Sequence, residues 1–313
     1  MRARDLVDGL LELSVVGSFS RPGYRLRRRL FGWSDPAPGS LEGRTVLVTG
    51  PTSGLGHATA VAMAALGARV LLVGRSRERL SRVRDELVER HGEDRFPVYL
   101  ADMSSISSVR VAVELIRRDE PRLDVLVDNA GAIMPERRTT ADGMETTFAT
   151  MVAGPFALID GLLPLLEASG DGHVISVVSG GMYLQSLPLH DLQYEEGDYD
   201  GTRAYARAKR ASAALAREWA RRYRGRVRFY SMHPGWADTP GVESSLPRFY
   251  QQLRGELRTP EQGADTLVWL ASSDEPMEAG RLWLDREPRR THLSPLTREK
   301  AGTRKELWSL CCE

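Results

Sequence analysis

Seven short apolar runs divide most of the chain, and helical segments separate nearly all of them. The runs are rich in valine, leucine and isoleucine without strict polar alternation, as expected for strands covered on both faces. Strand and helix in turn indicate parallel strands joined by right-handed crossovers. The chain is therefore predicted to form an α/β fold, a Rossmann-type doubly wound sheet of seven parallel strands flanked by helices. The predicted strands are 45–50, 68–74, 96–102, 123–131, 172–180, 226–235 and 280–285, and the predicted helices are 54–66, 76–90, 105–119, 143–168, 202–223 and 259–273.

The alternating pattern occupies residues 44–285, which we take as the main domain, with residues 286–313 as a C-terminal tail. Residues 1–43 form an amphipathic and basic extension that ends in a linker rich in proline and glycine. Its leucine stripe could dock on the body of the protein or on a second subunit. Alternatively, residues 1–32 could lie on an anionic membrane surface, with the arginines of residues 25–31 near the headgroups.

Composition excludes some classes of protein. A formal net charge of +1 gives no reason to expect a nucleic acid partner. The two cysteines, Cys311 and Cys312, are adjacent and have no separated partner, so a reducing, cytoplasmic setting is expected. The chain contains no run of eighteen uninterrupted apolar residues, so no membrane-spanning helix is expected. The acidic stretch 195–200 is predicted to be a solvated loop rather than a metal site.

The first predicted strand leads into a glycine-rich turn and then an alanine-rich helix. Gly50 supplies the turn, Gly54 permits close approach of a phosphate, and Gly56 permits close packing of the helix on the sheet. Ser53 and Leu55 lie in the same loop, whose N–H groups at the helix start would face an anion. This context of strand, loop and helix predicts a dinucleotide site.

The end of the second strand bears on which dinucleotide binds. A carboxylate there would hold the ribose 2′-hydroxyl of NAD, but this chain has Gly74 followed by Arg75. An arginine can pair with a 2′-phosphate, which favours NADP(H) over NAD(H). Asp102, at the end of the third strand, could accept a hydrogen bond from the adenine amino group, or could simply belong to a helix N-cap.

Tyr205 and Lys209 are four residues apart on a predicted helix, so their side chains leave the same face. An ordinary phenol titrates near pH ~10, and a neighbouring ammonium favours the phenolate. Tyr205 could therefore exchange a proton near neutral pH. The chain has only three lysines, at 209, 300 and 305, and otherwise uses arginine for positive charge, so a specific role is expected for Lys209.

Five landmarks follow one another in a recognisable order. They are TGPTSGLG at 49–56, NAG at 129–131, Ser179 at the end of the fifth strand, YARAK at 205–209 and HPGWADT at 233–239. Together they resemble the short-chain dehydrogenase/reductase family over residues 44–285. The resemblance, with Arg75, implies an NADP(H)-dependent oxidoreductase that interconverts a carbonyl and an alcohol, and a tendency to form homo-oligomers.

The resemblance also implies roles for individual residues. Tyr205 is the acid/base at the substrate oxygen, and Lys209 lowers the pKa of Tyr205 and hydrogen-bonds the nicotinamide ribose. Ser179 positions the substrate oxygen. The remaining cofactor contacts implied are Asn129, Ala130, Gly131, Pro234, Gly235 and Thr239.

One position departs from the family pattern. Met151 stands where the family usually has an asparagine that supports a proton relay to the lysine. A thioether cannot reproduce the donors and acceptors of an amide. The relay must use another route, or turnover is slow, or the protein is an NADP(H)-binding sensor or scaffold with weak catalysis.

The substrate side is predicted from apolar residues. A helical stripe in residues 236–258 suggests a lid with an apolar underside, although the same stripe could merely cap the core. A lipophilic ketone, aldehyde or alcohol is the expected small-molecule substrate. The lid stripe is Val242, Leu246, Phe249, Tyr250 and Leu253, and the predicted opposite wall is Met182, Tyr183, Leu184 and Leu187.

Overall fold

The computed structural model describes residues 3–273, 275 and 277–313. Its centre is one sheet with the strand order β3-β2-β1-β4-β5-β6-β7-β8, in which the first seven strands are parallel. The predicted doubly wound sheet is confirmed. The strands are β1 Thr45–Thr49, β2 Arg69–Gly74, β3 Val98–Leu100, β4 Val125–Asp128, β5 Gly172–Val177, β6 Val227–Met232, β7 Leu282–Leu284 and β8 Glu287–Arg289.

The predicted count of seven strands is wrong by one, because β8 pairs with β7 as an antiparallel edge strand. Leu284 pairs with Glu287, so Asp285 and Arg286 form a two-residue turn, with φ values of 56° and 57°. Such a turn favours Asn-Gly or Asp-Gly. Neither a glycine nor an apolar run marks this hairpin in the sequence, since β8 contains only glutamate, proline and arginine.

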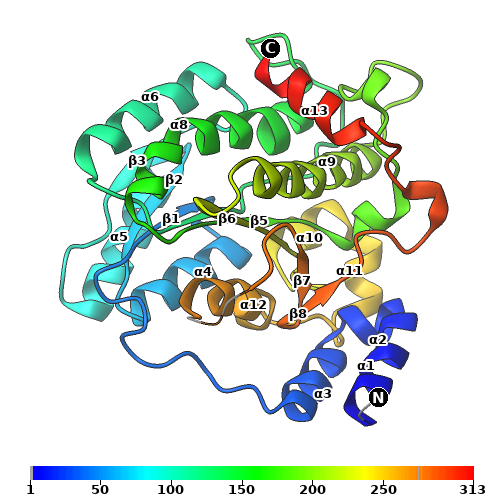
Figure 1. The fold of residues 1–313 in the computed structure, drawn as a ribbon, viewed down its shortest axis with the longest axis horizontal. Helices are drawn as coiled ribbons and strands as arrows, with labels where there is room; N and C mark the ends of the chain where they lie inside the picture. Colours follow the sequence, from blue (N-terminus) through cyan, green and yellow to red (C-terminus); the bar gives the residue numbers. More distant parts are fainter. Residues whose placement is uncertain (1–2, 274, 276) are drawn as a thin grey trace.

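Helices cover both faces of the sheet (Figure 1). On one face, α4 (Gly54–Ala65), α5 (Arg77–His91) and α12 (Pro260–Ser272) pack around one apolar core. On the other, α6 (Ile106–Asp119), α8 (Gly154–Ala168) and α9 (Gly201–Arg222) pack around a second. Smaller elements join them: α7 Thr146–Phe148, a π-helical turn Ala149–Ala153, 3-10 turns Gly180–Leu184 and Leu189–Asp191, α10 Pro240–Ser245 and α11 Pro247–Leu253.

One helical stretch of the described chain, Thr146–Ala168, is long and apolar enough to cross a membrane. However, 67% of its apolar window is buried inside the protein. The stretch packs on α6 and lines the core beside the sheet. Its hydrophobicity is thus accounted for by the core.

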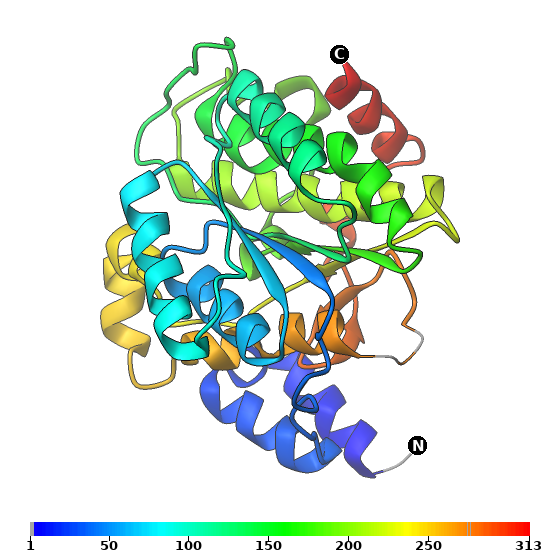
Figure 2. The ribbon, with the colours of Figure 1, turned by 90° about the vertical axis from the view of Figure 1, so that its left-hand side faces the viewer.

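The N-terminal residues form a helical layer of α1 (Ala3–Leu13), α2 (Val15–Phe19) and α3 (Arg21–Phe31). Figures 1 and 2 show this layer, in blue, against the β7–β8 end of the molecule. The segment docks on the body as one interpretation expected, but not through its leucines. Asp8 and Glu12 of α1 face inward to Arg27 and Arg289, whereas Leu6, Leu10 and Leu13 are exposed.

The C-terminal residues also pack on the body. After a 3-10 turn at Pro295–Thr297, α13 (Thr303–Cys312) lies on α9. The Trp308 ring packs against both Trp219 and Phe156, at centroid distances of 4.3 and 5.0 Å. The tail therefore closes one side of the second core.

Candidate active site

A cavity of about 530 Å³ opens beyond the carboxyl ends of the parallel strands. Cavities of this size and position hold cofactors in doubly wound folds. All sixteen site residues expected from the sequence line it. They are Gly50, Ser53, Gly54, Leu55, Gly56, Arg75, Asp102, Asn129, Ala130, Gly131, Ser179, Tyr205, Lys209, Pro234, Gly235 and Thr239.

The glycine loop forms a cradle between β1 and α4. Gly50 and Gly54 have positive φ values of 67° and 51°. A Cβ on Gly56 would lie 2.2 Å from the Gly50 carbonyl oxygen, so only glycine lets α4 start this close to the loop. Ser53 is the N-cap residue, but its side chain makes no capping hydrogen bond. The first N–H groups of α4 are therefore open to an anion, which fits a dinucleotide pyrophosphate.

Thr49 is a structural residue of the site that sequence reasoning missed. Its hydroxyl oxygen accepts hydrogen bonds from the backbone N–H groups of Asn129 (2.9 Å) and Ala130 (3.0 Å). The Asn129 amide in turn donates to the Thr49 carbonyl at 2.9 Å. These bonds fix the end of β4 against the glycine loop. A threonine ending an apolar strand was the only signal for it in the sequence.

Two arginines stand at the cavity edge beyond β2. Arg75 was expected there, and Arg79 of α5 joins it. Within the part of the chain that the structure describes, neither guanidinium has an ion-pair partner, and Glu78 of the same helix pairs with Arg82 instead. Ser76 lies between them at the helix N-cap. This set suits a phosphate better than a ribose hydroxyl.

Asp102 lies at the cavity edge, but Ser105 is the N-cap residue of α6. One Asp102 carboxylate oxygen accepts from the Ser104 N–H (2.9 Å) and the Ser104 hydroxyl (2.7 Å). These bonds hold the carboxylate in a tight turn. Asp102 is thus a turn residue at the cavity edge, and its contact with adenine stays a prediction.

Tyr205, Ser179 and Lys209 all line this cavity. Burial raises the pKa of the Tyr205 phenol, and the neighbouring Ser179 hydroxyl opposes this effect. The Lys209 ammonium donates to the Val177 carbonyl at 2.8 Å and lies 5.8 Å from the Tyr205 ring centroid. Burial lowers the pKa of Lys209, and buried Asp128 opposes this.

The expected depression of the Tyr205 pKa by Lys209 is thus absent from this arrangement, because the ammonium is directed at Val177 and burial dominates. The phenol is held in its protonated form. Burial raises the pKa of the Asp128 carboxyl to about 6, and the charge of Lys209 opposes this.

Met151 lies behind the cavity, in the π-helical turn between α7 and α8. Its sulfur packs against Gly131, since a Cβ built on that glycine would be 2.8 Å from Sδ. The Met151 carbonyl accepts from the Ser212 hydroxyl at 3.0 Å. The side chain is 1% exposed and belongs to the apolar core, so it fills the space beside Gly131 with apolar atoms.

The substrate side differs in part from expectation. Of the lid stripe, Val242, Leu246 and Phe249 line the cavity, and Tyr250 is buried instead. The four residues predicted for the opposite wall do not line it. The 3-10 turn directs Met182 and Tyr183 into a separate apolar cluster with Phe19, and it leaves Leu184 exposed. The other lining residues, which were not predicted as site residues, are Thr52, Val73, Gly74, Ser76, Arg79, Ala101, Met103, Ser104, Ala132, Ile133, Met134, Thr146, Thr150, Val177, Val178, Gly180, Gly181, Trp236, Ala237, Pro240 and Gly241.

The glycine cradle, the tyrosine, lysine and serine cluster and the doubly wound sheet define a class of dinucleotide-dependent enzyme. The family model described as short chain dehydrogenase matches residues 44–191. Human dehydrogenase/reductase SDR family member 12 is 40% identical over 85% of this chain and 84% of that protein. The chain therefore belongs to the short-chain dehydrogenase/reductase family and is an oxidoreductase.

Two further relatives agree with this assignment. Mouse retinol dehydrogenase 14 is 34% identical over 87% of this chain and 86% of that protein. A short chain dehydrogenase from Escherichia coli CFT073, solved in complex with NADPH, is 25% identical. It superimposes with a TM-score of 0.66 over 80% of this chain and 100% of that chain. A nicotinamide dinucleotide is thus the cofactor that the family and the cradle support.

Proposed function

We propose that the protein interconverts a lipophilic ketone or aldehyde and its alcohol with NADP(H). The observation that carries the proposal is that Ser179, Tyr205 and Lys209 line one cavity together with the open N-terminus of α4. A proton donor and an anion cradle in one cavity suit reduction of a carbonyl by a bound dinucleotide.

The chain's own residues would orient the substrate and handle the proton. The bound cofactor supplies or accepts the hydride. Tyr205, kept protonated by burial, donates its proton to the carbonyl oxygen, and Ser179 holds that oxygen by a second hydrogen bond. In the reverse direction, the phenolate left by loss of that proton takes the proton of the alcohol. Lys209, whose side chain donates to the Val177 carbonyl at 2.8 Å, would also hydrogen-bond the nicotinamide ribose.

The nature of the cavity walls supports a lipophilic substrate. Val242, Leu246, Phe249 and Trp236 contribute apolar surface from the segment after β6. Apolar walls with few polar groups recognise carbon skeletons and leave orientation to the catalytic hydrogen bonds. Retinol dehydrogenase 14, whose name specifies a lipophilic alcohol, is similar to this chain over 87% of its length.

Tyr205→Phe tests the proposal directly. Reduction of a panel of lipophilic carbonyls, followed through NADPH absorbance, should fall at least about 100-fold, because the general acid is removed. NADPH binding should survive this change, whereas Lys209→Ala should impair both binding and turnover. Tyr199→Phe is the matched control, since its hydroxyl bonds Thr147 and Glu145 outside the cavity. Full turnover in Tyr205→Phe would eliminate the proposal.

A sensor or scaffold that binds NADP(H) with weak catalysis is the second candidate. The buried apolar side chain of Met151 behind Gly131 favours it, because no amide is available there for a proton relay. In an enzyme, Met151→Asn should raise an already measurable rate modestly. A sensor would show no rate in the parent protein, and the substitution would either create activity or change nothing.

Residues 1–32 are also proposed to contact an anionic membrane surface, with the protein otherwise cytoplasmic. Leu6, Leu10 and Leu13 of α1 are 52%, 59% and 84% exposed, and α3 carries exposed arginines. An outward apolar face beside positive charge suits the boundary of headgroups and acyl chains. Sedimentation with phosphatidylserine vesicles should fall in Leu10→Asp, whereas Leu296→Asp, at an exposed C-terminal leucine, should not change it. Equal sedimentation with neutral vesicles would exclude an electrostatic contribution.

The tendency of the family to form homo-oligomers stays a prediction for this chain, and sedimentation velocity would test it.

A further inference from the structure

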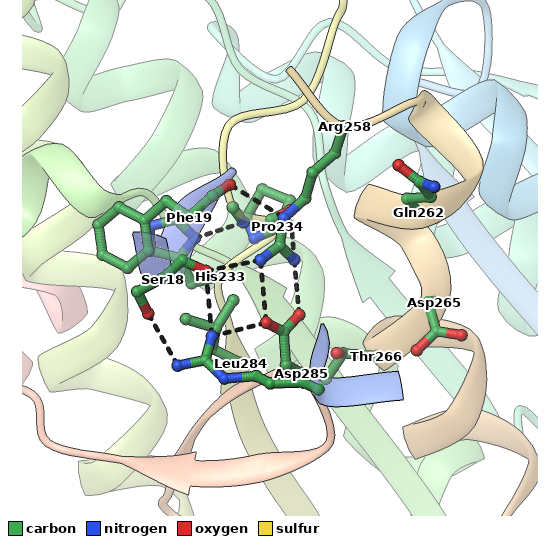
Figure 3. Close-up of polar contacts among 12 residues, drawn as sticks. Ser18, Phe19, His233, Pro234, Arg258, Gln262, Asp265, Thr266, Leu284 and Asp285 are labelled. Carbon is green, nitrogen blue, oxygen red and sulfur yellow. Dashed lines mark hydrogen bonds and ion pairs between the residues drawn. The ribbon is translucent and has the colours of Figure 1, made fainter. Parts of the chain in front are cut away.

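The junction of α2 and α3 lies directly against the segment that follows β6. This segment, Pro234–Ala237, lines the cavity. The Phe19 carbonyl accepts from the Trp236 N–H at 2.8 Å and from the Arg258 Nε at 2.9 Å. Residues from opposite regions of the chain thus share hydrogen bonds at the edge of the cavity (Figure 3).

Arg258 connects the N-terminal layer to the cavity segment. Its side chain is 1% exposed, and its Nη2 donates to the Ser18 carbonyl at 2.8 Å. Its backbone pairs with the same segment, since the Arg258 N–H donates to the Trp236 carbonyl at 2.7 Å. A Cβ on Gly235 would lie 2.3 Å from the Arg258 Nε, so the guanidinium packs against the cavity segment itself.

Two buried arginines share one carboxylate in this network. Asp285, 1% exposed, accepts from Arg258 at 2.6 Å and from Arg27 at 2.8 Å. Arg27 is fully buried and also donates to the Ser18 carbonyl at 3.0 Å. Asp8 and Glu12 of α1 supply the remaining negative charge, each 2.7 Å from Arg27. The network therefore fixes residues 18–19 against the body with its charges compensated.

The Phe19 ring contacts two segments that line the cavity, the one after β6 and the one that contains Gly180. Its centroid is 4.4 Å from that of His233 and 5.8 Å from that of Trp236. A Cβ on Gly180, the residue after catalytic Ser179, would lie 3.0 Å from the Phe19 ring. The Phe19 side chain thus supports both the Pro234–Ala237 segment and the backbone next to Ser179.

We propose that Phe19 is a positioning residue for the cofactor, and that residues 1–31 complete the active site rather than merely extend the domain. The proposal rests on the proposed NADP(H)-dependent function. Phe19, held by Arg27 and Arg258, sets the distance between the Pro234–Ala237 segment and Ser179. Without the ring, both segments lose their support, and the half of the dinucleotide near β6 binds in a looser site.

Titrations of NADPH and NADH against three variants test this positioning role. Phe19→Ala should raise the dissociation constants of NADPH and NADH about tenfold. Both should rise by the same factor, because the segment that Phe19 supports follows β6, whereas Arg75, which would bind the 2′-phosphate, follows β2, four strands away in the sheet order. Phe19→Leu should recover most of the affinity, since it restores apolar volume behind His233. Leu41→Ala removes a fully buried side chain of the first core, and it controls for loss of stability alone.

The outcomes separate the two proposals. Unchanged dissociation constants in Phe19→Ala, or an equal loss in Leu41→Ala at the same fall in melting temperature, would overturn the positioning role and leave the function standing. A wild-type protein that binds neither dinucleotide overturns both. If Phe19→Ala does not fold, Phe19→Leu decides: about threefold weaker binding at wild-type stability supports the role, and unchanged binding removes it.

Discussion

Replacing Arg75 and Arg79 by alanine should weaken binding of NADPH and leave binding of NADH almost unchanged. Both arginines line the cavity beyond β2, and neither has an ion-pair partner among the residues that the structure describes. The two dinucleotides differ only in the 2′-phosphate. NADH therefore measures every other consequence of the substitutions, including any change in the glycine cradle.

The magnitude follows from the exposure of the two side chains. In water, two unit charges 4 Å apart attract each other by about 1 kcal/mol, and a phosphate monoester carries a charge of about −1.5 to −2. Salt screens such exposed contacts. Each arginine should thus contribute about 1 to 1.5 kcal/mol, which is close to a tenfold change in the NADPH dissociation constant. Because both act on one phosphate, the double variant should lose about thirtyfold rather than the full hundredfold product.

Fluorescence titration with each dinucleotide, at low and at high salt, measures these changes. Arg77→Ala is the matched control, because Arg77 begins the same helix α5 but does not line the cavity. The NADPH preference should shrink at high salt in the parent protein and should be nearly absent in the double variant. Equal losses for NADPH and NADH, or equal affinity for both in the parent, would refute the role of the arginines.

Three further predictions concern stability. Burial lowers the pKa of His173 from the ordinary 6.5 to about 4, so the unfolded chain binds a proton that the folded protein does not, and stability falls as pH drops from 6.5 to 4. His173→Phe should remove up to about 3 kcal/mol of this loss in urea titrations at pH 7 and pH 4.5, and an unchanged pH slope would contradict it. Trp308→Ala should cost about 3 kcal/mol of unfolding free energy, whereas exposed Leu310→Ala should cost less than about 0.5, and equal effects would show that α13 is not docked. Asp285→Asn should cost about 3 to 5 kcal/mol at pH 7 in the same titrations, because two buried arginines lose their shared charge, and a neutral result would show that the arginines find other partners. The arginines lower the pKa of Asp285, so its contribution is present above the ordinary carboxyl pKa and disappears as pH falls through the lowered value.

The location of the site was predictable because it depends on strand ends. Residues that follow parallel strands meet at one edge of the sheet, so Gly50, Arg75, Ser179 and Gly235 came together without any knowledge of tertiary contacts. The predicted helices are confirmed, with limits that moved by three residues at most.

Other features depended on partners far away in the chain. The face of α1 that packs on the protein is acidic because Asp8 pairs there with Arg27 and Arg289. Hydrophobic periodicity alone predicted that the opposite, leucine-rich face would be buried. The β8 hairpin turns through Asp285, whose positive φ is stabilised by two buried arginines rather than by a glycine. Neither partnership leaves a local pattern in the sequence.

The position of the nicotinamide ring in a crystal structure of the NADP⁺ complex tests the central claim most directly. The account predicts a dinucleotide that crosses the carboxyl edge of the sheet, with its 2′-phosphate at Arg75 and its nicotinamide beside the Tyr205 hydroxyl. A ring bound far from that hydroxyl, or a cavity closed to the dinucleotide, would contradict it.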